Sequence, residues 1–123
     1  GQVTATPFGM ALVAAAVANG SAPLPVLVEG SATTVDEEIA PAPAEVTAAL
    51  RTMMRETITG GTASMLRDIP DLTGKTGTAE YGENDGAHGW FVGSRDNLAF
   101  AVFVAGANGS APAVEAAGRW LRG

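Results

Sequence analysis

The segment from Thr73 to Glu80, with the sequence TGKTGTAE, places one ammonium group among hydroxyl groups and glycines. Lys75 is the only lysine among the 123 residues. An ammonium is a compact charge with three hydrogen-bond donors, and a threonine hydroxyl can donate one more. The segment is therefore a candidate site for binding a carboxylate. The alternative interpretation is an ordinary turn with a solvated lysine.

An extended conformation suits this segment, because it lies between a helical region and a hydrophobic hairpin. Side chains alternate along a strand, so Thr76 and Thr78 share one direction and Gly77 leaves a gap in the other. Glycine inside a strand often marks the close approach of a ligand or another backbone. We therefore expect an extended peptide to pair with this edge, and its carboxylate to meet Lys75 and the hydroxyls. A backbone N–H at such an edge can form half of an oxyanion hole.

The surrounding sequence resembles a known family. The Lys75–Glu80 segment, followed about ten residues later by Trp90-Phe91-Val92-Gly93, resembles the two antiparallel active-site strands of class B penicillin-binding proteins, the monofunctional peptidoglycan transpeptidases. The resemblance covers roughly residues 1–105 in the family's order. Its upstream parts are Thr6-Pro7-Phe8-Gly9-Met10-Ala11, Ala18-Asn19-Gly20, Met53-Met54 and Gly61-Thr62-Ala63.

This resemblance implies a serine acyl-transferase without a cofactor. Such enzymes act on the D-Ala-D-Ala end of peptidoglycan stem peptides, and β-lactam antibiotics acylate the same serine. By motif position, Lys75, Thr76 and Thr78 would bind the substrate carboxylate. The Thr78 N–H would complete the oxyanion hole, and Gly77 would keep the cleft open. The resemblance also implies a location at the extracytoplasmic face of the cell membrane, with the anchor outside this chain.

Two further elements of the family, Ser-x-x-Lys and Ser-x-Asn, have no counterpart here. The single lysine already belongs to Lys-Thr-Gly, and no serine stands two residues before an asparagine. We therefore expect residues 1–123 to form the C-terminal portion of one transpeptidase domain, inactive alone and completed by an upstream segment of the same protein. A β-lactam sensor domain, a D,D-carboxypeptidase or a serine β-lactamase also fits Lys-Thr-Gly, and a purely structural fragment is a further alternative. The upstream Thr-Pro and Asn-Gly elements favour the transpeptidase.

Composition narrows the function classes. The absence of cysteine excludes disulfides and thiolate metal sites, and the single histidine, His88, argues against a protein-only zinc site. A net charge of −6 argues against binding nucleic acid through phosphate contacts. The continuous apolar run at residues 10–18 is too short to span a bilayer, and we recognise no signal peptide.

The pattern predicts an α+β fold in which helices pack on an antiparallel sheet. Thr6 as an N-cap, Pro7, and Asn19-Gly20 as a C-cap predict a first helix. A second helix at 45–59 should end at Gly60-Gly61, and a third should begin near Pro112. Strands are expected at 74–80, 89–93 and 98–105, with a loop at 82–86 and a turn at 94–97. Residues 21–44 read as an acidic surface connection with a short strand at 26–28.

Several side chains have plain structural interpretations. Core packing is expected for Met53, Met54 and Trp90, and lining of the cleft is the alternative for Trp90. Core packing is also expected for the helix face formed by Phe8, Leu12, Ala15 and Ala16. His88 reads as a rim or packing residue, and Glu80 as a solvated carboxylate or a partner for a substrate amine. Ser94-Arg95-Asp96 imitates a Ser-x-Asx element but is better explained by a hairpin turn. Thr62 is expected to cap a short helix that extends to Arg67.

Overall fold

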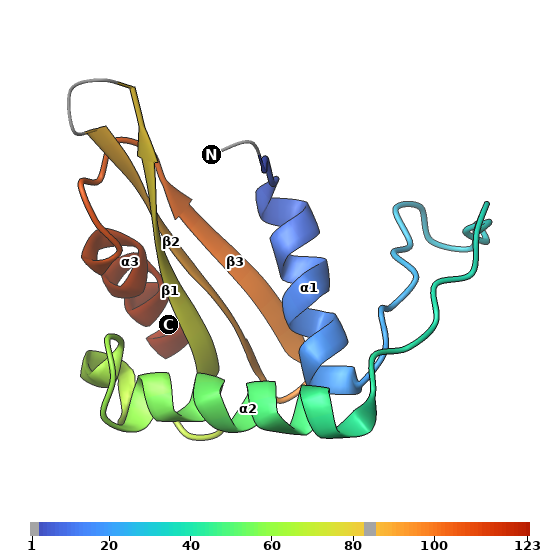
Figure 1. The fold of residues 1–123 in the computed structure, drawn as a ribbon, viewed down its shortest axis with the longest axis horizontal. Helices are drawn as coiled ribbons and strands as arrows, with labels where there is room; N and C mark the ends of the chain where they lie inside the picture. Colours follow the sequence, from blue (N-terminus) through green and yellow to red (C-terminus); the bar gives the residue numbers. More distant parts are fainter. Residues whose placement is uncertain (1–2, 83–85) are drawn as a thin grey trace.

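The computed structural model describes residues 3–82 and 86–123 and shows helices packed on a three-stranded sheet (Figure 1). The elements are α1 (Pro7–Asn19), α2 (Ala44–Thr59), the 3-10 helix η1 (Ser64–Leu66), β1 (Thr73–Tyr81), β2 (Gly86–Arg95), β3 (Leu98–Val104) and α3 (Ala111–Arg122). The strands are antiparallel in the order β1-β2-β3, which confirms the predicted α+β fold. In the predicted loop at 82–86, residues 83–85 lie outside the described residues, and Gly86 already belongs to β2.

The helix ends follow the local capping chemistry. The Thr6 hydroxyl accepts a hydrogen bond from the Gly9 N–H at 3.0 Å, which satisfies one of the free donors at the start of α1. Gly20 adopts a left-handed conformation with φ of 85° and closes the other end. At the end of α2, the N–H groups of Gly60 and Gly61 both donate to the Glu56 carbonyl. These predicted helix boundaries are therefore confirmed to within one residue.

The register divides the sheet into two faces, because residues paired across strands point the same way. Thr76 pairs with Phe91 on one face, and Lys75 pairs with Val92 on the other. Phe91 lies in the main core with residues of η1, α2 and α3. The members of this core are Ile58, Ala63, Leu66, Ile69, Leu72, Phe91, Phe100, Ala113, Val114 and Ala117. The Lys75 face instead meets α1 and α2 across a cavity described below.

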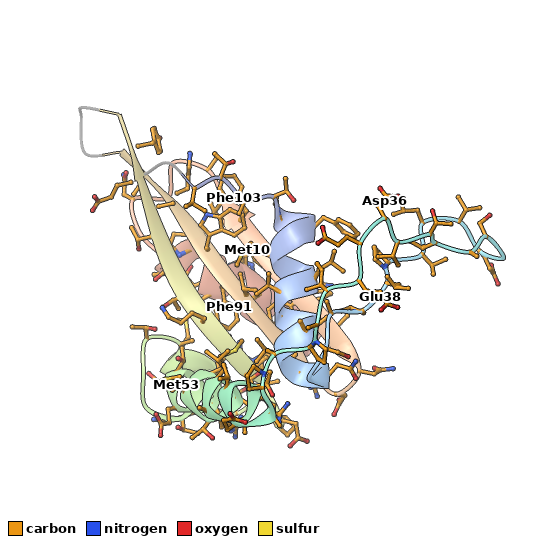
Figure 2. The ribbon with its side chains drawn as sticks, turned by 45° about the vertical axis from the view of Figure 1, so that its right-hand side comes forward. Met10, Asp36, Glu38, Met53, Phe91 and Phe103 are labelled. Carbon is orange, nitrogen blue, oxygen red and sulfur yellow. The ribbon has the colours of Figure 1, made fainter. Side chains whose placement is uncertain are left out.

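The connection between α1 and α2 is confirmed as a surface segment. It extends away from the body of the molecule, as the positions of Asp36 and Glu38 show (Figure 2). The predicted short strand at 26–28 is wrong: this part has no strand conformation, and Leu27 is 84% exposed. Its run of apolar residues is typical of a strand, but no strand within the described residues pairs with this segment.

The predicted core role of the α1 face is only partly correct. Phe8 is 55% exposed, and Leu12, Ala15 and Ala16 are half-buried, while Ala14 is buried. The predicted face is not the one turned toward the cavity described below, because the α1 residues that line this cavity are Met10, Val13, Ala14 and Val17. Within the described residues, no helix has both the length and the apolar character needed to cross a membrane.

Candidate functional site

Two sets of contacts outside the ladder fix the start of β1. The Arg55 guanidinium, from α2, donates to the Leu72 carbonyl at 2.8 Å. The Thr73 hydroxyl lies 2.8 Å from the Ser94 hydroxyl on β2. The start of β1 is therefore tied to α2 at Leu72 and to β2 at Thr73.

Lys75 projects from the face of the sheet that meets α1 and α2. Its Nζ donates to the carbonyl of the next residue, Thr76, at 2.7 Å. No carboxylate among the described residues forms an ion pair with it. Because an ammonium carries three donors, the remaining donors and the uncompensated charge suit an anionic ligand.

A cavity of about 790 Å³ lies between this face, α1 and α2. Met10, Met53 and Phe103, from α1, α2 and β3, contribute to its apolar wall (Figure 2). Lys75 is the only Lys, Arg, Asp or Glu among the lining residues that the structure describes. The arrangement thus places one exposed positive charge at the wall of a largely apolar space.

Three residues predicted to pack in the core, the methionine pair and Trp90, lie at this cavity instead. Met53 is 53% exposed, Met54 is half-buried, and both line the space. Trp90 is also half-buried and lines it, as the alternative interpretation anticipated. Their apolar surface is therefore oriented as expected, but no described residue fills the volume that they face.

Thr76 and Thr78 share one direction along β1, opposite to Lys75, as strand alternation requires. Thr76 is 8% exposed, and its hydroxyl lies 2.7 Å from the Thr62 hydroxyl. Thr78 is exposed. Lys75, Thr76 and Gly77 all line the cavity, whereas Thr78 does not, and the Thr76 hydroxyl also contacts the turn after α2.

The role predicted for Thr62 is wrong. The short helix that follows is the 3-10 helix η1, and no side chain caps its start. Thr62 lies in the tight turn after Gly61 and reaches across to β1, so its hydroxyl is not available as a local cap. Sequence reasoning missed this contact because it joins residues 14 positions apart in the chain.

Two glycines of the segment, Gly74 and Gly77, are needed for different structural reasons. A side chain at Gly77 would begin 3.2 Å from the Trp90 Cβ, so it would crowd the cavity face. A Cβ at Gly74 would lie 2.4 and 2.5 Å from two atoms of the Phe91 ring. Gly74 is therefore required by the core, and Gly77 keeps the surface beside Lys75 open.

The remaining candidate residues have structural roles. The His88 Nδ1 accepts the Gly106 N–H at 3.1 Å, and the ring stacks on Tyr81 at 4.1 Å, which confirms a packing role. Ser94 belongs to β2 rather than to a turn, and the turn is shorter than predicted, with Asp96 at φ of 51°. Glu80 is exposed at the end of β1. Among the described residues, no three His, Cys, Asp or Glu side chains come close enough to hold a metal ion.

One known family matches nearly the whole chain. The family described as the penicillin binding protein transpeptidase domain matches residues 1–121. The chain belongs to this family. No curated protein and no solved structure gives a match.

Membership in this family places the chain among penicillin-binding transpeptidases, which are enzymes of the acyl-transferase type. In this transpeptidase family member, the only lysine lies at the wall of an apolar cavity on an edge strand. The fold of this part, three helices and a three-stranded antiparallel sheet, is consistent with a part of such a domain.

Proposed function

We propose that this chain is the C-terminal portion of the transpeptidase domain of a class B penicillin-binding protein. The complete enzyme would cross-link peptidoglycan stem peptides at the extracytoplasmic face of the membrane, through an anchor outside this chain. The chain supplies the Lys-Thr-Gly wall of the site. The observation that carries the proposal is the isolated charge of Lys75 on an apolar cavity, in a member of this family.

The Lys75 ammonium would hold the carboxylate of a stem peptide that ends in D-Ala-D-Ala. β1 pairs only with β2 among the described strands, so its outer edge can accept an extended peptide as an added strand. The hydroxyls of Thr76 and Thr78, on the other face of β1, would donate to the same carboxylate where it lies beside the outer edge of the strand. The Thr78 N–H would stabilise the negative charge that develops on the attacked carbonyl oxygen. Gly77 would leave room for the substrate backbone.

The nucleophile in this proposal comes from an upstream segment of the same protein. A serine hydroxyl is a weak nucleophile without an adjacent base, and the only lysine of this chain belongs to Lys-Thr-Gly. The apolar cavity beside Lys75 would accept that segment, which would bring the serine and its base to the carboxylate site. In this proposal, the upstream segment would cover the apolar side chains of α1, α2 and the sheet that line the cavity.

The proposed reaction is an acyl transfer in two steps. The serine oxygen attacks the penultimate carbonyl, forms an ester and expels D-Ala, whose nitrogen takes up the serine proton. An amine of a second stem peptide then attacks the ester carbonyl and forms the cross-linking amide. The serine oxygen regains a proton from that amine. A β-lactam follows the first step and remains attached as the acyl-enzyme, whereas a carboxypeptidase or a β-lactamase would release the acyl group to water.

The decisive experiment replaces Lys75 by alanine and by arginine in the complete protein, which contains both this sequence and the nucleophile. Loss of a charge-assisted hydrogen bond should slow acylation by a fluorescent penicillin about 10- to 100-fold. Arginine should rescue poorly, because a planar guanidinium fork does not replace a point charge. The melting temperature should stay unchanged, since the Lys75 side chain is exposed.

A matched control is Arg119→Ala, which removes a positive charge from an exposed position on α3, a helix that packs against the opposite face of the sheet. This variant should be acylated at the wild-type rate. A folded Lys75→Ala protein that reacts as fast as the control would contradict the proposed role of the lysine. Release of the acyl group to water faster than to a stem-peptide amine would favour a carboxypeptidase or a β-lactamase.

A further inference from the structure

Thr62 lies in a turn whose geometry leaves it little freedom. After α2 ends, the Gly61 N–H donates to Glu56 and the Ala63 N–H donates to the Thr57 carbonyl at 3.1 Å. A Cβ at Gly61 would lie 2.8 Å from the Thr57 Cα, so the turn needs glycine at this point. Ala63 is fully buried in the main core. Thr62 itself is exposed, yet its backbone is fixed on both sides.

From this turn the Thr62 hydroxyl reaches only one side-chain partner among the described residues, the Thr76 hydroxyl at 2.7 Å. Each hydroxyl has one proton, and either oxygen can be the donor in this pair. A carboxylate ligand can only accept. If Thr76 donates its one proton to a substrate carboxylate, its 2.7 Å contact with Thr62 is a hydrogen bond only when Thr62 is the donor.

We propose that Thr62 is a positioning residue for carboxylate binding: it donates to Thr76 and thereby directs the Thr76 proton toward the ligand. This inference rests on the proposed function, because it takes Thr76 as part of the carboxylate site. It adds a residue from the turn after α2 to a site otherwise built from β1. The physical basis is that a hydroxyl whose oxygen already accepts is left with its proton free to donate.

The test compares Thr62→Ala with Thr62→Ser in the complete enzyme. The probes are benzylpenicillin and its methyl ester, which keeps the reactive ring but has no anionic carboxylate. Thr62→Ala should lower the second-order acylation rate constant for benzylpenicillin about tenfold, as expected for loss of one hydrogen bond in a charged site. Thr62→Ser should stay within about twofold of wild type, because the serine hydroxyl keeps the donor. The acylation rate constant for the ester should fall by less than about twofold in either variant, because the ester has no carboxylate for Thr76 to bind.

The chain offers a matched control in a second pair of hydroxyls that also joins β1 to another element. Thr73 and Ser94 form a second hydroxyl pair at 2.8 Å, and Ser94 is buried. Ser94→Ala should lower the melting temperature without changing the acylation rate for benzylpenicillin. A purely structural role of Thr62 would instead make Thr62→Ala resemble Ser94→Ala.

A double-mutant cycle completes the test. In a Thr76→Ala background, Thr62→Ala should cause no further loss, because the group that it positions is gone. An unreactive wild-type enzyme would overturn the proposed function and this inference with it. A reactive wild type would overturn this inference alone in any of three cases: Thr62→Ala leaves the rate unchanged, it affects penicillin and ester equally, or its effect adds to that of Thr76→Ala.

Discussion

Replacing Gly74 by alanine should disturb the core directly behind the Lys75 segment. The new methyl group would lie 2.4 and 2.5 Å from the Phe91 ring, whereas carbon atoms in contact are normally about 3.5–4.0 Å apart. Phe91 has 0% exposure and packs against the Phe100 ring at a centroid distance of 5.7 Å. The ring therefore has no open space to enter, and either the ring or β1 must shift by about 1 Å.

The magnitude follows from two opposing effects. Overpacking of a core costs about 1–3 kcal/mol, and removing a strand glycine returns about 0.5–1 kcal/mol. With the middle of each range, the net loss is about 1.25 kcal/mol. For 123 residues the unfolding entropy is about 0.26 kcal/mol/K, so 1 kcal/mol corresponds to about 4 °C. We therefore expect the melting temperature to fall by about 5 °C.

Thermal unfolding of the purified protein, followed by circular dichroism, measures this change. Gly60→Ala is the control, since its Cβ would meet nothing within 4 Å, and it should melt within about 2 °C of wild type. Phe91→Leu should cost less in the Gly74→Ala background than in wild type, because a leucine relieves the clash. A Gly74→Ala protein as stable as Gly60→Ala, or additive effects in the double mutant, would refute the steric reasoning.

Three other predictions concern the proposed site, the surface and the chain alone. Thr78→Ser and Thr78→Val both keep the backbone N–H, so only valine should slow penicillin acylation; equal rates would remove the hydroxyl from the site. The hydrogen bond from the Arg122 guanidinium lowers the pKa of Asp68. Such a carboxylate adds stability above its ordinary pKa and loses it as pH falls through the lowered value, so the melting temperatures of wild type and Asp68→Asn should converge below about pH 4. Finally, this chain alone should show no stoichiometric mass increase with excess penicillin, and an adduct on one of its serines would place the nucleophile here.

Local chemistry predicted much of the fold. Thr6, Pro7 and Gly20 act within a few residues of their own positions, so the ends of α1 followed from the sequence. The alternation around Lys75 likewise follows from strand geometry alone. These features need no knowledge of distant neighbours.

Features that depend on distant neighbours could not be predicted in the same way. The Thr62 hydroxyl binds across to Thr76, and no local pattern indicates that partner. Met53 and Trp90 have the apolar character of core residues, but their burial depends on what occupies the cavity that they line. The same holds for residues 26–28, whose strand-like sequence has no described strand beside it.

The position of α1 has a consequence for the order in which the molecule can assemble during synthesis. α1 packs against β3 and β2, and 78 residues separate Asn19 from Leu98, the first residue of β3. At about 5–20 residues per second, the ribosome needs about 4–16 s to reach β3 after completing α1. The α1 sequence contains no charged residue, so an uncharged, largely apolar helix waits for its partner strand throughout this interval. A chaperone that shields short apolar segments would therefore act first on residues 7–19, well before the Lys75 strand has left the ribosome.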